Sequence, residues 1–281
     1  MNKISKHQKN RPPLGQHFLH DEAVLEKIAS MVHPSKNLVL EIGPGTGNLT
    51  EVLLDKGFEV YAIEIDSRLV KKLVNKFDKK VSNFKRLRVL EGDARSYDLT
   101  DVLKDKHYSV VANLPYYAAN PIIRRFLESH PKPDNMVVML QREVAREMVA
   151  EGGKFSILGI SVQLYAKVNF LFDVLPEAFL PPPSVVSSVL YLELRSDPLV
   201  PFPLIPDFFH LVKGAFKNPR KQLHNALLSA PWAGDNFGLN EARVILERAK
   251  INSSRRPETL SIEEWVLILK EFKTLGIKLE D

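Results

Sequence analysis

Short apolar segments rich in β-branched residues recur through the first part of the chain, each bounded by Gly, Pro, Asn or charged residues. They predict β-strands at residues 37–42, 59–65, 87–93, 108–114 and 135–140. Between them lie stretches with apolar residues at helical spacing, such as residues 67–77, where one face carries Leu69, Val70, Leu73, Val74 and Phe77. Strands that alternate with helices are typical of βαβ units, so we expect an α/β fold with a doubly wound, mostly parallel, Rossmann-like sheet.

Two later apolar segments follow one another without a helical pattern between them. They span residues 168–175 and 187–194. Because no crossover helix separates them, we expect the two segments to pair antiparallel at the edge of the sheet.

The hydrophobic pattern changes after Arg195. Residues 196–206 contain four prolines and show no periodicity, which is typical of a linker. Beyond them the pattern is helical: Ser261 and Glu264 form a capping-box sequence, and Gly276 fits the position just after a helix. We therefore expect a sheet domain at residues 1–195, a linker at 196–206 and a smaller all-helical domain at 207–281.

Composition adds limits to this prediction. The chain has no cysteine, which excludes disulfides and cysteine zinc sites, and no other pattern indicates a metal site. No apolar stretch is long enough to span a membrane, and no signal-peptide core follows the basic residues 1–12. We expect a cytoplasmic protein whose residues 1–12 form a flexible basic arm. The formal net charge of +5 favours a polyanionic partner such as nucleic acid.

A glycine-rich segment, EIGPGTGNLT at residues 41–50, lies between the first predicted strand and a helix. Gly43, Gly45 and Gly47 allow the backbone to turn tightly and to approach a ligand closely. A dinucleotide-binding fingerprint requires Gly or Ala where this chain has Asn48. Taken alone, the segment is as compatible with a ligand-free turn as with a cofactor site.

Acidic residues end the next two predicted strands. Glu64 lies about 20 residues after Gly43, where an acid accepts hydrogen bonds from ribose hydroxyls in nucleotide-binding folds. We expect the nearby Asp66 to open the following helix instead. Asp93 can accept a hydrogen bond from an adenine amine, or else cap a helix. Because the ends of parallel strands converge on one crevice, the glycine-rich segment and the two acids together indicate an adenosine-containing cofactor.

The fourth predicted strand ends in Asn113-Leu114-Pro115-Tyr116, which places an amide beside an aromatic ring. The exocyclic amine of a base is a poor nucleophile because its lone pair is delocalised into the ring. The side-chain oxygen of Asn113 and the carbonyl of Pro115 can accept its hydrogens and free the lone pair. Tyr116 can stack on the base, a contact worth ~1–3 kcal/mol. The electrophile that this arrangement needs is the methyl group of a sulfonium. The alternatives are a turn residue at Asn113 and a pair of core or rim aromatics at Tyr116 and Tyr117.

An ordered set of segments runs along nearly the whole chain: LGQHFL (14–19), EIGPGTGNLT (41–50), IEID (63–66), GDA (92–94), NLPY (113–116), QREVAREM (141–148) and FLPPPSVVSSV (179–189). This set resembles the S-adenosylmethionine-dependent rRNA adenine N6,N6-dimethyltransferases of the KsgA type. The resemblance implies a class I methyltransferase fold with S-adenosylmethionine as the cofactor. By resemblance the cofactor site contains His17, Leu19, Gly43, Gly45, Glu64, Asp93, Ala94 and Asn113. The target adenine would be held by Asn113, Pro115, Tyr116 and Phe179.

The resemblance also implies a substrate and a partner. Enzymes of this family methylate two adjacent adenosines in a hairpin near the 3′ end of small-subunit rRNA. We therefore expect a monomer that acts on rRNA within an assembling, 30S-type subunit, with no membrane and no metal involved. The chain departs from the family pattern at Ser184 and Val186, where the family often has Lys and Asp.

Basic residues gather in the C-terminal part. Residues 211–227 carry Lys213, Lys217, Arg220, Lys221 and His224 without an acidic residue, which favours phosphate contact over a merely solvated helix face. A similar stretch in KsgA-type enzymes supports small-subunit rRNA and argues against the relatives that methylate large-subunit rRNA. Further basic residues are Arg243, Arg248, Lys250, Arg255 and Arg256, balanced in the sequence by Glu241, Glu247 and Glu258.

Two other functions remain to be weighed against the enzyme. A ribosome-assembly or RNA-binding factor could use the same fold without catalysis, but such a protein has no use for the Asn113 amide. A nicotinamide-dependent oxidoreductase conflicts with Asn48 and with the lack of an acid or base for hydride transfer. We therefore predict an rRNA adenine dimethyltransferase, with a non-catalytic assembly factor as the alternative.

Overall fold

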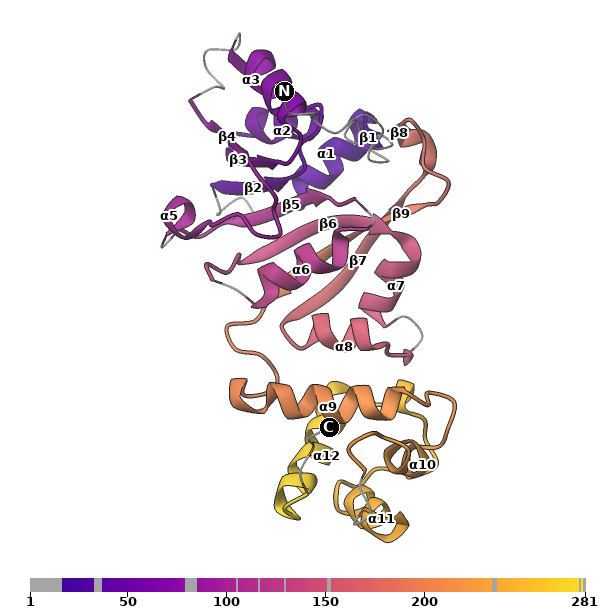
Figure 1. Cartoon of the computed structure of the whole chain (residues 1–281). Coiled ribbons are helices and arrows are strands. Elements are labelled where there is room, and N and C mark those ends of the chain that lie inside the picture. The colour runs from indigo at the N-terminus through magenta and orange to yellow at the C-terminus, as the bar shows by residue number, and fades with distance from the viewer. Residues whose placement is uncertain are drawn as a thin grey trace, which may run out of the picture. The chain divides into compact units, whose positions relative to one another are not determined.

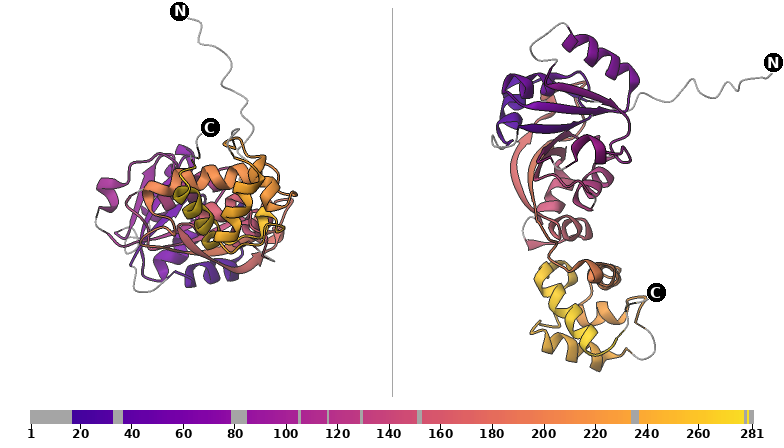
Figure 2. Two further views of the ribbon diagram at one scale, coloured as in Figure 1. Left: turned by 90° about the horizontal axis from the view of Figure 1, so that it is seen from below. Right: turned by 90° about the vertical axis from the view of Figure 1, so that its left-hand side faces the viewer.

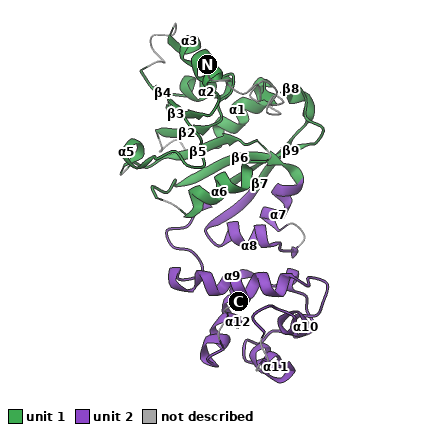
Figure 3. Ribbon diagram, in the orientation of Figure 1, with its two compact units in different colours: residues 1–142, 170–192 green, residues 143–169, 193–281 purple. Residues whose placement is uncertain are grey.

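The computed structural model describes residues 17–32, 37–78, 85–104, 106–115, 117–128, 130–150, 153–233, 237–277 and 279 (Figure 1). The basic arm predicted at residues 1–12 and the side chain of Tyr116 lie outside the described residues. The chain divides into two compact units, one made of residues 1–142 and 170–192 and the other of residues 143–169 and 193–281 (Figure 3).

A seven-stranded sheet with the order β4-β3-β2-β5-β6-β9-β7 forms the centre of the fold (Figure 1). Its parallel strands are β2 (Leu38–Ile42), β3 (Glu59–Glu64), β4 (Leu87–Glu91), β5 (Ser109–Asn113) and β6 (Asn135–Gln141). The strand order reverses at β2, which has β3 on one side and β5 on the other, so ligands are expected to bind at this point. The sheet confirms the predicted doubly wound α/β fold.

Helices cover this sheet, as Figure 2 shows in two further views. They are α1 (Glu22–Ser30), α2 (Asn48–Asp55), α3 (Ser67–Asp78), α5 (Thr100–Leu103) and α6 (Ala119–Glu128). The helix predicted from helical spacing is α3, and it buries Leu69, Leu73 and Phe77. Of the other two residues predicted on this face, Val70 is half-buried and Val74 is exposed. Strand β2 is buried along its whole length, as expected of a parallel strand that is covered on both faces.

Three further strands complete the sheets. In the main sheet β9 (Ser187–Leu194) neighbours β7 (Ala166–Val174), and β7 is the edge strand, as the sequence predicts for these two segments. A separate two-stranded sheet pairs β1 (Phe18–Leu19) antiparallel with β8 (Phe179–Leu180), which follows the short helix η3 (Pro176–Ala178). This small sheet joins segments that are distant in the sequence, and strands of two residues leave no periodic signal.

The second unit is helical. It contains most of α7 (Arg142–Val149), then α8 (Ile157–Gln163), η4 (Phe202–Leu204), α9 (Ile205–Phe216), α10 (Leu223–Leu228), α11 (Leu239–Arg248), η5 (Pro257–Thr259) and α12 (Ile262–Thr274). Phe208, Trp265 and Phe272 are fully buried in its core. The predicted capping box is present at the start of α12, and Gly276 after that helix has a φ of 67°.

Residues 143–169 pack with the C-terminal helices, although they lie inside the predicted sheet domain at residues 1–195. Backbone hydrogen bonds join Phe155 N to the Glu258 carbonyl (2.7 Å) and Leu199 N to the Leu164 carbonyl (3.0 Å). Helix α9 begins at Ile205, two residues before the predicted start of the helical domain at residue 207. Within the described ranges, no helix is long and apolar enough to cross a membrane.

Candidate active site

One cavity collects the predicted site residues of the sheet unit. It is lined by His17, Leu19, Gly43, Gly45, Glu64, Asp93, Ala94, Asn113, Pro115 and Phe179, among others. The strands β2, β3, β4 and β5 are parallel and adjacent, so the segments that follow them meet at the same edge of the sheet. The glycine-rich segment and the acids that end β3 and follow β4 therefore meet in one cavity, as predicted. Tyr116 is the predicted site residue that lies outside the described residues.

The glycine-rich segment turns under the ring of Phe18. Gly45 has a φ of 57°, and a Cβ atom added there would lie 2.9 Å from Cδ1 of Phe18. A side chain at this position would thus be strained by its backbone conformation and would collide with β1. The glycine is needed so that the loop and β1 can together enclose this end of the cavity.

Glu64 is fixed at the end of β3 and is 4% exposed. Its Oε2 accepts a hydrogen bond from the Gly45 N–H (3.2 Å), and its Oε1 accepts one from the Asp66 N–H (3.0 Å). Asp66 itself accepts the N–H of Arg68 (2.9 Å) at the start of α3, as predicted for a helix-opening residue. Hydrogen bonds from Arg68 lower the pKa of Asp66 to about 2. Glu64 thus lines the cavity, whereas Asp66 stabilises the start of α3.

Asp93 lies after β4, where its carboxylate binds Arg95. Its Oδ1 accepts the Arg95 N–H (2.9 Å), and the Arg95 guanidinium donates to Oδ1 and Oδ2 at 2.6–3.0 Å. These hydrogen bonds lower the pKa of Asp93 and so favour its charged form as a hydrogen-bond acceptor. The carbonyl of Asp93 accepts the N–H groups of Ser96 and Tyr97, so the residue caps a turn and not the helix considered as the alternative.

Asn113 is the last residue of β5, and a hydrogen bond orients its side-chain amide. Its Nδ2 donates to the His17 carbonyl (3.3 Å), which leaves the side-chain oxygen to accept from a ligand. The Pro115 carbonyl accepts the Ala118 N–H (2.8 Å) at the start of α6. A carbonyl has two lone pairs, so one remains for the second acceptor role that the sequence predicts.

The small β1–β8 sheet supplies contacts that sequence reasoning missed. Asn48, the departure from a dinucleotide fingerprint, donates from Nδ2 to the Leu19 carbonyl (2.9 Å) and so holds β1 against the glycine-rich segment. His17 Nδ1 lies 2.7 Å from the Pro181 carbonyl. Phe179 is 3% exposed and belongs to the same apolar cluster as Leu19, so it forms a wall of the cavity.

Glu41 lines the cavity, and no role was predicted for it beyond its place in the glycine-rich motif. It is 2% exposed, and its Oε2 accepts the Thr50 hydroxyl at 2.6 Å. Burial raises the pKa of Glu41 to about 7; the charge of Glu64 adds to the rise, whereas the Thr50 hydrogen bond and the charge of Lys76 oppose it. This carboxyl group therefore titrates near neutral pH.

Comparison with known proteins decides the family. The model of the ribosomal RNA adenine dimethylase family matches residues 7–271. The chain belongs to this family. The ribosomal RNA small subunit methyltransferase A of Dehalococcoides mccartyi is 39% identical over 263 residues, which cover 92% of this chain and 87% of the relative.

Solved structures agree with the family. A dimethyladenosine transferase from Plasmodium falciparum has a TM-score of 0.79 at 28% identity, covering 94% of this chain and 100% of the other. The 23S rRNA methyltransferase ErmE has a TM-score of 0.72 at 24% identity, covering 91% of this chain and 99% of the other, and shows the shared fold alone. Membership in the dimethylase family confirms the predicted methyltransferase fold, the rRNA adenine dimethyltransferase activity and S-adenosylmethionine as the methyl donor.

The predicted RNA-binding residues of this dimethylase lie on the helical unit. Lys213 lies on α9, and Lys217, Arg220 and Lys221 lie on the segment between α9 and α10; all four are exposed. Lys221 Nζ donates to Ser229 Oγ (2.9 Å). None of the four forms an ion pair with a described residue, so their charge is not compensated locally.

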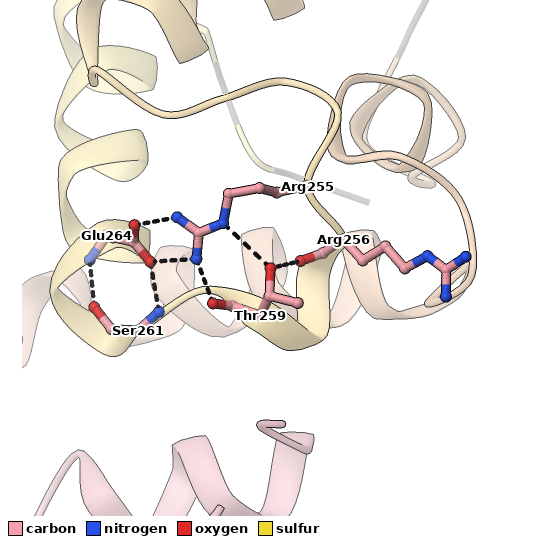
Figure 4. Close-up of polar contacts among 5 residues, drawn as sticks. All are labelled: Arg255, Arg256, Thr259, Ser261 and Glu264. Atoms are coloured by element: carbon pink, nitrogen blue, oxygen red, sulfur yellow. Dashed lines mark hydrogen bonds and ion pairs between the residues drawn. The ribbon is translucent and has the colours of Figure 1, made fainter. Parts of the chain in front are cut away.

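The second group of basic residues is partly internal to the fold. Arg255 forms an ion pair with Glu264, the carboxylate that also accepts the Ser261 N–H (2.8 Å) in the capping box (Figure 4). Arg248 lies 3.9 Å from a carboxylate oxygen of Glu271. The partners are therefore residues of α12 and not the sequence neighbours Glu247 and Glu258. Arg256 extends away from this cluster (Figure 4).

Proposed function

We propose that this chain dimethylates the N6 amines of two adjacent adenosines in the 3′-terminal hairpin of small-subunit rRNA, within an assembling subunit. The observation that carries the proposal is the meeting of Glu64, Asp93 and Asn113 in one cavity at the ends of the strands β3, β4 and β5. The small subunit is favoured because the curated relative from Dehalococcoides mccartyi is a ribosomal RNA small subunit methyltransferase A.

The cavity fits S-adenosylmethionine by the chemistry of its residues. The Glu64 carboxylate is held by Gly45 and Asp66 and is placed to accept ribose hydroxyls. Asp93 would accept a hydrogen bond from the adenine amine, and Ala94 lines the same cavity. The cofactor supplies an electrophilic methyl group on its sulfonium.

The target adenosine would enter beside Asn113. Its amine would donate one hydrogen to the Asn113 side-chain oxygen and the other to the free lone pair of the Pro115 carbonyl. Both acceptors are fixed in advance, Asn113 by the His17 carbonyl and Pro115 by the Ala118 N–H. Fixed acceptors stabilise the developing positive charge on nitrogen without reorganisation, so these contacts would strengthen in the transition state.

The exposed cations Lys213, Lys217, Arg220 and Lys221 would bind phosphates of the subunit RNA. Because they form no ion pair with a described residue, their charge is available to phosphate. Phosphate contacts give affinity and position without base specificity. The helical unit would therefore set where the enzyme docks, and the cavity would set what it modifies.

One experiment tests the proposal. The protein is incubated with labelled S-adenosylmethionine and small subunits from cells that lack this methylation, and the modified nucleotides are then mapped. We expect label on the N6 atoms of two adjacent adenosines in the 3′-terminal hairpin. Large subunits are the matched control. Label elsewhere in the small subunit, or on large subunits, would contradict the assignment.

A further inference from the structure

The loop that follows β4 is shaped by close contacts around Gly92, in addition to the hydrogen bonds between Asp93 and Arg95. The Gly92 N–H donates to the Glu64 carbonyl (2.9 Å), and the ring of Tyr97 covers Gly92 so closely that an added Cβ atom would lie 2.4 Å from Cδ2. The loop presents Asp93 and Ala94 to the cavity. Its exact placement decides where the Asp93 carboxylate meets an adenine amine.

Arg125, on helix α6, holds this loop from outside. One guanidinium nitrogen of Arg125 donates to the Ala94 carbonyl, and the other donates to the Tyr97 carbonyl. The two carbonyls belong to opposite ends of the turn that contains Arg95. A planar guanidinium binds two acceptors in a fixed geometry, so both ends of the turn are fixed by one side chain.

The same helix begins directly after the proposed base-binding segment. The Pro115 carbonyl accepts the Ala118 N–H (2.8 Å), and α6 starts at Ala119. The buried residues of α6 include Ile122 and Phe126, which anchor the helix in the core. Arg125 therefore connects the loop that presents Asp93 to the rigid element that follows Pro115.

The neighbouring arginine shows what an ordinary surface residue does on this helix. Arg124 is exposed and pairs with Glu128 one turn later (2.9 Å). Arg125 is half-buried and donates hydrogen bonds to backbone carbonyls of the loop after β4. Burial lowers the pKa of Arg125, opposed by Tyr108, Asp98 and Asp93. Removing a charged side chain from water to bind two carbonyls indicates a specific structural requirement.

We infer that Arg125 is a positioning residue that fixes the conformation of the loop after β4. It thereby sets the preference of this enzyme for a cofactor with an adenine base over a cofactor whose base lacks the amine. The inference rests on the proposed role of Asp93 as the acceptor of the cofactor's adenine amine. Arg125 is not among the residues that line the cavity. It acts through the main chain at Ala94 and Tyr97.

The test compares two ligands that differ at the amine. S-adenosylhomocysteine carries it, and S-inosylhomocysteine has a carbonyl oxygen in its place. Calorimetry measures both affinities for the wild type, Arg125→Gln, Arg125→Lys and the matched control Arg124→Gln. In the wild type we expect S-inosylhomocysteine to bind roughly 10- to 100-fold more weakly, the loss expected for one hydrogen bond to a charged acceptor.

Both Arg125 variants should lose this discrimination. We expect the ratio of the two affinities to fall to roughly threefold or less, because the carboxylate is no longer held where the amine meets it. Arg125→Lys should not rescue the ratio, since one ammonium group cannot reproduce the two-carbonyl geometry. Arg124→Gln should keep the wild-type ratio.

The outcomes separate this inference from the proposed function. A ratio that stays at the wild-type value in a folded Arg125→Gln or Arg125→Lys protein would overturn the role of Arg125 while leaving Asp93 and the methylation proposal intact. Equal binding of both ligands by the wild type would overturn the role of Asp93 and, with it, this inference. The mapping of modified nucleotides is unaffected by either result.

Discussion

The backbone N–H of Gly45 donates a hydrogen bond to Oε2 of Glu64 over 3.2 Å, which joins the loop after β2 to the end of β3. Glu64 is buried, and its second oxygen is bound by the Asp66 N–H (3.0 Å). The carboxylate therefore has its orientation before any ligand arrives. Such preorganisation reduces the entropy that binding has to overcome.

Replacing Glu64 with Ala should weaken S-adenosylmethionine binding by about 1.5–3 kcal/mol, the usual size of hydrogen bonds to a charged group. Calorimetry measures the affinity, and circular dichroism confirms that the variant is folded. Glu59→Gln, at the opposite end of β3, is the matched control and should bind like the wild type. Unchanged affinity in a folded Glu64→Ala protein would rule out the ribose role.

Replacing Asn113 with Ala should slow methyl transfer far more than it weakens cofactor binding. The amide oxygen is proposed to bind the amine most strongly in the transition state, and losing one such contact typically costs about 10²- to 10³-fold in rate. Single-turnover methylation with saturating subunits measures the chemical step, and calorimetry measures cofactor binding separately. A rate within a few-fold of the wild type would show that this amide does not activate the amine.

Glu41 should make the free energy of unfolding depend on pH. Its pKa is about 7 in the folded protein against a usual value of 4.5, because the carboxyl is buried. Its contribution to stability is fully present below pH 4.5 and is lost as pH rises through 7, since the folded state then has to hold a buried charge. The loss is on the order of 3 kcal/mol between these limits.

Glu41→Gln isolates that contribution, because the amide resembles the protonated carboxyl and does not titrate. Urea unfolding of both proteins at pH 5 and pH 8.5 gives the comparison. The variant should gain stability relative to the wild type as pH rises. A difference between the two proteins that is the same at both pH values would contradict the raised pKa.

The sheet and the cavity could be predicted because their signals are local. Apolar strands, glycines and strand-end acids lie within short segments, and parallel pairing alone brings Glu64, Asp93 and Asn113 together. The contacts that were missed join distant segments. Asn48 binds the Leu19 carbonyl, and Arg125 binds two carbonyls of the loop after β4. Backbone acceptors carry no residue signature, so the sequence could not indicate such bonds.

The basic residues illustrate the same limit. Glu247 and Glu258 are close in sequence to Arg248 and Arg255, yet the ion pairs form with Glu271 and Glu264 of α12. Charge counts along the chain therefore did not identify the acidic partners of Arg248 and Arg255. Which cations remain available for RNA depends on tertiary packing.

Changing Lys213, Lys217, Arg220 and Lys221 together to Gln should weaken binding to small subunits and flatten its salt dependence. For phosphate contacts the slope of log K against log salt falls by roughly 0.7–0.9 per charge lost. Binding is measured across a salt series, and S-adenosylmethionine affinity should not change because the cofactor cavity belongs to the sheet unit.

A charge-matched control separates local contact from net charge. Lys71, Lys72, Arg88 and Arg124 are exposed on the sheet unit, and changing them to Gln removes the same formal charge. If the four cations of the helical unit bind phosphates, their removal should change the slope much more than the control does, because counterion release requires close contact. Equal slopes for the two quadruple variants would show that only net charge matters, and RNA docking would then have to involve other cations, of which Arg256, extending away from the Arg255–Glu264 cluster, is the first to test.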